Sequence, residues 1–152
     1  MRQRLVVLIS GSGTNLLSLL ENLPQMDIPA DVVAVGSETD APGLLHAKER
    51  SLPTFVVPLS EFSSREEWGV ALGGALDSYS PDLVILSGFM KLLPASVVSR
   101  FAPRILNTHP AYLPEFPGAH AVRDALEAGV SQTVASVIVV DEGIDTGEIL
   151  AQ

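Results

Sequence analysis

The sequence contains no cysteine, and aromatic residues make up only 5% of its 152 residues. Without cysteine, disulfide bonds, thiolate metal sites and a cysteine nucleophile are excluded. Basic side chains are also scarce, with 9 Lys and Arg against 18 Asp and Glu, which gives a formal net charge of −9. We expect no nucleic-acid partner, because there is no basic stripe to neutralise phosphates.

Long hydrophobic runs are absent as well. Mean hydropathy is high, +0.33, but runs such as residues 5–9 and 83–86 fall far short of the roughly 18 residues that span a membrane. Strands buried on both faces of a sheet explain the apolar content better. The start, MRQRLVVLISGSG, resembles a secretory signal, but its apolar run is short and ends in a glycine turn. We therefore expect a cytoplasmic protein with no membrane contact.

Short runs of Val, Ile and Leu alternate with helix-like segments. They predict strands at residues 5–10, 32–35, 54–57, 83–87, 105–107 and 134–140, and helices at 15–23, 43–50, 64–79, 95–101 and 121–128. This alternation predicts an α/β fold, Rossmann-like, with a mostly parallel sheet and helices on both faces, in a single domain over residues 1–152. The final GEILAQ has the pattern of a strand at its start, so we expect the C-terminal part of the domain to be missing.

Ligands bind such sheets outside the carboxyl ends of the strands, which makes residues 11–15, 88–93 and 107–120 the candidate segments. The first of these follows a strand and opens a helix. Its glycines allow a ligand close to the backbone, Thr14 or Asn15 can cap the helix, and free N–H groups at a helix start favour an anion. Leu16 occupies the third glycine position of a dinucleotide fingerprint, and the Gly-Lys-Ser/Thr of a P-loop is absent. The loop is typical of a site for a small phosphate monoester, the alternative being a turn that binds nothing.

Asn107 and His109 follow the strand at 105–107. In an extended backbone both side chains project to the same side, where an amide and an imidazole can stabilise charge on oxygen and move a proton. A structural turn is the alternative. A carboxylate beside the histidine would favour its protonated form. Asp141, Glu142 and Asp145 are the candidates, and their spacing does not distinguish between them.

The sequence pattern indicates no catalytic role for the other two histidines. His46 lies within a helical pattern and is expected to be structural or exposed. For His120, in the proline-rich loop, a backbone hydrogen bond and a ligand contact are equally compatible with the sequence. Three dispersed histidines make no metal set, and LSGFM lacks the elbow motif of a serine nucleophile. We therefore expect no metal site and no serine nucleophile.

Four motifs together resemble the folate-dependent formyltransferase family. They are VVLISGSGTNL, which is similar to its phosphate loop, LSGFMKLL, similar to its folate segment, LNTHPAYLPEFPGAHAVRDAL, similar to its catalytic signature, and VDEGIDTGEI, similar to the loop that supplies its aspartate. The motifs occur in the family's order. The resemblance implies the formyltransferase fold and transfer of the formyl group of 10-formyltetrahydrofolate, the cosubstrate, to the amine of glycinamide ribonucleotide in purine biosynthesis. Since relatives can dimerise, a homodimer is also compatible with it.

The resemblance implies roles residue by residue. Substrate phosphate would be held by Gly11, Ser12, Gly13, Thr14 and Asn15. Folate would be bound by Arg65, Met90, Lys91, Leu92, Leu93, Asn107, Asp141, Glu142, Gly143, Ile144 and Asp145. Asn107, His109 and Asp145 would be catalytic, with the amide and the protonated imidazole stabilising the developing oxyanion and Asp145 favouring the imidazolium.

Some positions depart from the family pattern. Val122 stands where relatives often have a second histidine, Lys91 replaces a common arginine, and DEGIDTG holds one extra residue. Three other functions remain open. Methionyl-tRNA formyltransferase and formyltetrahydrofolate hydrolase share the Asn–His–Asp set but differ in the first loop, and a non-enzymatic phosphate-binding module would use the loop at 11–15 alone.

Overall fold

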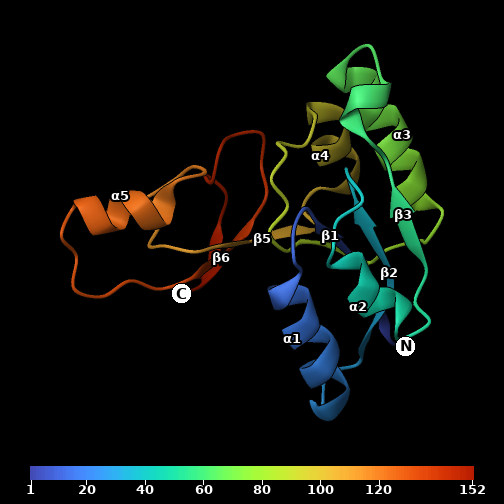
Figure 1. The fold of residues 1–152 in the computed structure, drawn as a ribbon, viewed down its shortest axis with the longest axis horizontal. Helices are drawn as coiled ribbons and strands as arrows, with labels where there is room; N and C mark the ends of the chain where they lie inside the picture. Colours follow the sequence, from blue (N-terminus) through green and yellow to red (C-terminus); the bar gives the residue numbers. More distant parts are fainter.

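The computed structural model describes residues 1–152 and contains one seven-stranded sheet in the order β3-β2-β1-β4-β5-β6-β7 (Figure 1). The strands are β1 (Gln3–Ile9), β2 (Ala30–Ser37), β3 (Thr54–Val56), β4 (Leu83–Leu86), β5 (Ile105–His109), β6 (Ser136–Val139) and β7 (Ile149–Ala151). The helices are α1 (Thr14–Asn22), α2 (Leu44–Lys48), α3 (Arg65–Asp77), α4 (Ala95–Phe101) and α5 (Ala121–Glu127), with short 3-10 turns at Leu23–Gln25 and Leu59–Glu61.

The sheet is parallel from β3 to β5, and its last two pairings, β5 with β6 and β6 with β7, are antiparallel. The prediction of a mostly parallel α/β sheet is therefore confirmed. The chain runs outward from β1 in both directions, so the order of strands reverses between β1 and β4. Ligands in open α/β sheets bind at this kind of switch point.

The central strand β1 is buried on both faces, as its unbroken apolar run predicts. Val6 and Leu8 belong to one core, together with the buried side chains of α3 and α4. Leu5, Val7 and Ile9 belong to a second core with those of α1 and α2. The two pairs of helices thus cover opposite faces of the sheet (Figure 1).

The start of helix α3 is held by a capping residue and by a buried aromatic side chain in its first turn. Ser64 accepts a hydrogen bond from the Glu67 N–H at 3.1 Å, and the Glu67 carboxylate accepts one from Ser63 Oγ at 2.6 Å. The first bond satisfies one free N–H donor of the first turn, and the second ties the helix to the residue before its cap. Trp68, fully buried, donates its ring N–H to the carbonyl of Val57 at 2.8 Å, which fastens the helix to the segment after β3.

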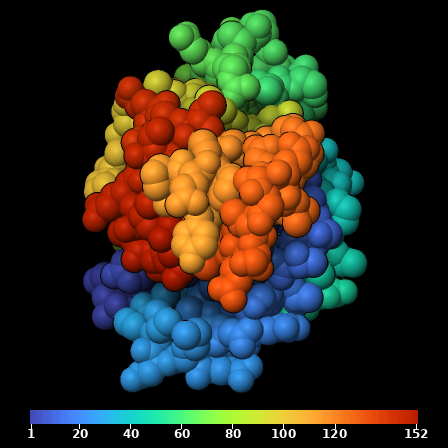
Figure 2. All heavy atoms as spheres, turned by 90° about the vertical axis from the view of Figure 1, so that its left-hand side faces the viewer, coloured from blue at the N-terminus to red at the C-terminus, as the bar shows by residue number.

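The antiparallel part of the sheet brings the end of the chain beside the candidate site. β5 continues to His109, two residues further than predicted, because Thr108 and His109 pair with β6. The strand pattern in GEILAQ is confirmed as β7. Figure 2 shows the segments after β5 gathered on one face of the molecule. None of the helices combines the length and the apolar character that a membrane-spanning helix requires.

Candidate active site

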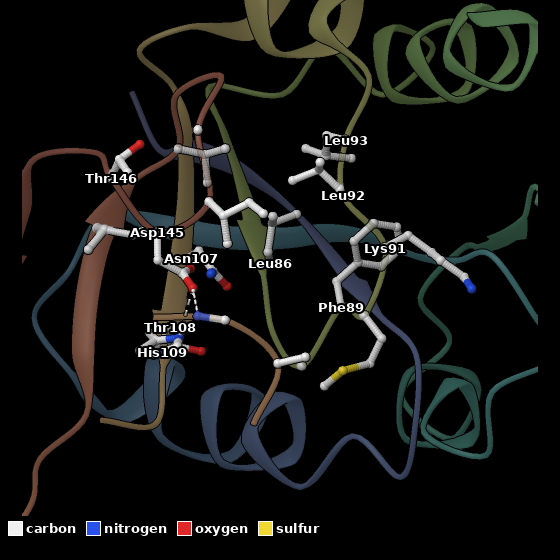
Figure 3. A pocket seen from close by; sticks show the side chains of 18 of the residues that line it. Leu86, Phe89, Lys91, Leu92, Leu93, Asn107, Thr108, His109, Asp145 and Thr146 are labelled. Atoms are coloured by element: carbon white, nitrogen blue, oxygen red, sulfur yellow. Dashed lines mark hydrogen bonds and ion pairs between the residues drawn. The ribbon is translucent and has the colours of Figure 1, made fainter. Parts of the chain in front are cut away.

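A cavity of about 500 Å³ lies at the carboxyl ends of β4 and β5. Eleven of the predicted site residues line it: Asn15, Met90, Lys91, Leu92, Leu93, Asn107, His109, Asp141, Gly143, Ile144 and Asp145. Six predicted residues do not: Gly11, Ser12, Gly13, Thr14, Arg65 and Glu142. In Figure 3 the labelled residues of β5 and the aspartate loop lie on one side of the cavity, and those of 89–93 lie opposite.

Ten further residues line the cavity that were not assigned individual roles from the sequence: Leu86, Gly88, Phe89, Thr108, Pro110, Gly118, Ala119, Ile138, Val140 and Thr146. Six of them lie in the segments 88–93 and 107–120 that were expected at the ligand-binding edge of the sheet. Two of the others are brought to the cavity by the register of the sheet. Asn107 lies opposite Leu86 of β4 on one side and Ile138 of β6 on the other. Because neighbours across strands present their side chains to the same face, these two apolar residues flank the amide.

His109 is buried, with acceptors at both ring nitrogens. Its Nε2 lies 2.5 Å from the carbonyl oxygen of Phe116, and its Nδ1 lies 3.5 Å from Oδ2 of Asp145. A carbonyl and a carboxylate oxygen can only accept hydrogen bonds. The Nε2 proton is therefore donated to the Phe116 carbonyl, and Nδ1 faces the carboxylate.

Asp145 is the carboxylate that faces the histidine. Its backbone is left-handed, with φ of 54°, and its Oδ2 also accepts the N–H of Gly118 at 2.8 Å. Gly118 has φ of 91°, a conformation that favours glycine. The aspartate therefore joins three segments: the end of β5, the proline-rich loop, and the loop after β6.

Asp141 and Glu142, the other two candidates, make no contact with His109. The Oδ1 of Asp141 accepts hydrogen bonds from the hydroxyl of Thr146 at 2.6 Å and from the N–H of Gly143 at 2.9 Å. The two hydrogen bonds, of which the one from the Thr146 hydroxyl has the larger effect, hold the pKa of Asp141 below its ordinary value. Its role in the structure is to close the loop that carries Asp145.

The loop after β1 presents free backbone donors. The N–H groups of Ser12, Gly13, Thr14 and Asn15 donate to no acceptor in the protein, and they lie at the start of the nine-residue helix α1. A helix start with free N–H groups favours an anion. Gly13 is left-handed, with φ of 70°, which explains the second glycine of the loop.

The predicted helix cap was wrong. Gly13 occupies the capping position and no side chain caps the helix. The Oδ1 of Asn15 is instead engaged by the hydroxyl of Ser87, which donates to it at 2.7 Å from the end of β4. With its oxygen held, Asn15 keeps its amide N–H groups free where the loop meets the cavity.

The opposite wall is fixed by side chains outside the cavity. The hydroxyl of Ser10 donates to the Glu38 carboxylate at 2.9 Å and accepts the N–H of Met90 at 2.8 Å. Arg65 donates a hydrogen bond to the carbonyl of Leu92. It thus contacts residue 92 of this wall but does not itself line the cavity. The ends of β1 and β2, together with α3, thereby position residues 90–92.

Comparison with known proteins identifies the family. The sequence profile described as formyl transferase matches residues 3–152. The phosphoribosylglycinamide formyltransferase of Mycobacterium tuberculosis (strain ATCC 25618 / H37Rv) is 51% identical over 149 residues, which are 98% of this chain and 69% of that protein. The protein of the same name from Escherichia coli (strain K12) is 40% identical over 149 residues, 97% of this chain and 70% of that protein.

Solved structures agree with this result. The crystal structure of glycinamide ribonucleotide transformylase 1 from Symbiobacterium toebii superimposes with a TM-score of 0.94 at 40% sequence identity, over 99% of this chain and 71% of that one. Similarity of both sequence and fold extends over almost all of the residues described here. The chain therefore belongs to the formyl transferase family.

Proposed function

We propose that the protein transfers the formyl group of 10-formyltetrahydrofolate to the amine of 5'-phosphoribosylglycinamide, a step of purine biosynthesis. One observation carries the proposal. In a chain of the formyl transferase family, a buried histidine whose Nδ1 lies 3.5 Å from Asp145 follows Asn107 by two residues on the same strand, and all three line one cavity. An amide and an imidazolium side by side suit a reaction in which negative charge develops on a carbonyl oxygen.

The cavity suits a folate-derived formyl donor. Its volume is within the usual range of small-molecule sites, roughly 300–1,000 Å³. Its apolar side chains, among them Leu86, Leu92 and Ile138, would contact the faces of a flat ring. Backbone groups of the loops at 90–93 and 141–145 are available for the polar edge of the ring.

The loop after β1 suits the second substrate. Four consecutive N–H groups without protein acceptors, from Ser12 to Asn15, would bind the phosphate of the ribonucleotide. Asn15 also lines the cavity, so a substrate anchored at the loop would extend toward the formyl donor. This second site favours transfer to an amine over the hydrolysis of formyl folate, which needs only water.

In the proposed reaction the amine nitrogen attacks the formyl carbon. A bond forms between them, the bond from that carbon to N10 of the folate breaks, the amine loses a proton and N10 gains one. Asn107 and the His109 imidazolium would donate hydrogen bonds to the formyl oxygen while it carries negative charge. That oxygen would take the place of the Phe116 carbonyl at Nε2. Asp145, at Nδ1, would balance the positive charge of the ring.

The test is an assay of formyl transfer from 10-formyltetrahydrofolate to the ribonucleotide, with formate release followed in parallel. We expect transfer by the wild-type protein and its loss in His109→Asn, with circular dichroism to check that the buried substitution leaves the fold intact. Formate release without transfer would replace the proposal by a hydrolase. Phosphate binding without any turnover would leave a binding module.

A homodimer, a cytoplasmic location and a single domain belong to the same proposal. Sedimentation equilibrium at micromolar concentration tests the first, since a dimer doubles the apparent mass. Fractionation of the host cell tests the second. A single cooperative unfolding transition, with the same midpoint by calorimetry and fluorescence, tests the third.

A further inference from the structure

His46 lies outside the cavity, yet it contacts the loop that we propose binds phosphate. Its Nε2 is 3.0 Å from the carbonyl oxygen of Ser12. Because a carbonyl oxygen only accepts, Nε2 carries the proton and donates it to this bond. The ring also packs against the loop itself, since a Cβ built on Gly13 would lie 3.3 Å from its Cδ2.

A second contact from the same segment fixes the preceding peptide. The N–H of Gly43, the residue before α2, donates to the carbonyl of Gly11 at 2.9 Å. The backbones touch here, because a Cβ on Gly43 would lie 2.8 Å from both N and Cα of Gly13. The carbonyls of Gly11 and Ser12 thus both point toward α2, where each has a donor.

The orientation of these carbonyls determines where the loop donors point. In a trans peptide the C=O and the N–H of the next residue point in opposite directions. With the carbonyls of Gly11 and Ser12 directed at α2, the N–H groups of Ser12 and Gly13 are directed away from it. Neither N–H has an acceptor in the protein, so both remain available to an anion.

We propose that His46 is a positioning residue for the anion-binding loop: by holding the Ser12 carbonyl, it directs the Gly13 N–H at the substrate phosphate. The inference rests on the proposed function for the identity of the substrate, but the geometry applies to any phosphate monoester. His46 does not touch the reacting atoms. Its effect is therefore on the binding of the phosphorylated substrate, and neither the chemical step nor the folate site depends on it.

The experiment compares His46→Leu, His46→Gln and the control Lys48→Gln with the wild type. Leucine fills space without a donor, while the glutamine amide can still donate to Ser12. Lys48 is exposed on the same helix, and its side chain has no hydrogen bond to the loop. Two readouts are taken: titration with inorganic phosphate followed by the amide signals of Ser12 and Gly13, and steady-state kinetics with both substrates.

For His46→Leu we expect a phosphate Kd and a KM for the ribonucleotide that are both raised about five- to tenfold, the effect of one hydrogen bond. Its kcat and its KM for the formyl folate should stay within about twofold of the wild type. His46→Gln should recover most of the loss, and Lys48→Gln should match the wild type. An unchanged phosphate Kd in His46→Leu, an equal loss for both substrates, or no recovery with glutamine would each overturn the assignment.

The two readouts separate this inference from the proposed function. If the wild-type protein binds phosphate at the loop but transfers no formyl group, the function is wrong, and the phosphate titration of the variants still decides the role of His46. If the protein transfers the formyl group and His46→Leu binds phosphate normally, only the role of His46 is wrong.

Discussion

Asp145 Oδ2 lies between two nitrogens, 3.5 Å from Nδ1 of His109 and 2.8 Å from the backbone N of Gly118. One carboxylate oxygen thereby faces the ring and holds the proline-rich loop at the same time. Replacement of the whole side chain would remove both contacts. Replacement by the isosteric amide keeps an oxygen for Gly118 and removes only the charge.

We therefore predict that Asp145→Asn lowers kcat for formyl transfer by about 100-fold or more, the usual contribution of proton transfer and charge stabilisation by a positioned group. The KM for the ribonucleotide, bound at a separate loop, should change little. The matched control is Asp124→Asn on α5, where the half-buried carboxylate pairs only with Arg123 at 3.8 Å. A kcat for Asp145→Asn within about twofold of the wild type would show that the charge has no role in the reaction.

A second prediction concerns how the loop that carries Asp145 responds to acidic pH. The hydrogen bonds from Thr146 and Gly143 hold the pKa of Asp141 below its ordinary value of 3.8. A carboxyl group with a lowered folded-state pKa stabilises the fold above its unfolded pKa, and this contribution is lost as the pH falls through the folded value. The amide signal of Gly143 should therefore titrate with a midpoint below 3.8. Thr146→Val, which removes the stronger donor, should move that midpoint upward.

The third prediction concerns Gly147, between β6 and β7. A Cβ at this position would lie 1.6 Å from the carbonyl oxygen of Val139, which is backbone. Gly147→Ala should lower the free energy of unfolding by about 1–3 kcal/mol, the usual cost of overpacking. Gly74, in the C-terminal part of α3 with nothing near its Cβ position, is the control. There alanine should stabilise by roughly 0.5–1 kcal/mol, because glycine is unfavourable inside a helix. Urea unfolding measures both, and equal effects of the two substitutions would contradict the steric argument.

Much of the fold could be predicted because its signals are local. The apolar run in β1 has no polar face, so it fits only a strand covered on both sides, and the two cores on either side of it confirm this. The partners of Asn107 in the cavity could not be predicted in the same way. They depend on the register of β5 with β4 and β6, which is set by pairing between segments far apart in the sequence.

The features of the site that could not be predicted from the sequence also depend on contacts between distant segments. Of three nearby carboxylates, Asp145 is the one that faces His109, and its backbone is left-handed; nothing in DEGIDTG indicates which residue adopts that conformation. Asn15 is a good helix-capping residue by type, but Ser87 from the end of β4 engages its oxygen instead. His46 has an ordinary helical context, and only the packing of α2 against the loop after β1 brings it to Ser12.

The last prediction concerns Ser10, whose hydroxyl connects Glu38 with the N–H of Met90. Ser10→Ala removes an acceptor from the first residue of the 90–93 wall and leaves its N–H without a partner, at a typical cost of about 1 kcal/mol. We expect the KM for the formyl folate to rise about fivefold with little change in kcat. Glu38→Gln keeps an acceptor for the hydroxyl and should leave this KM nearly unchanged. If both variants raised the KM for the ribonucleotide instead, residues 90–93 would belong to the phosphate side of the site, and the folate would have to bind elsewhere in the cavity.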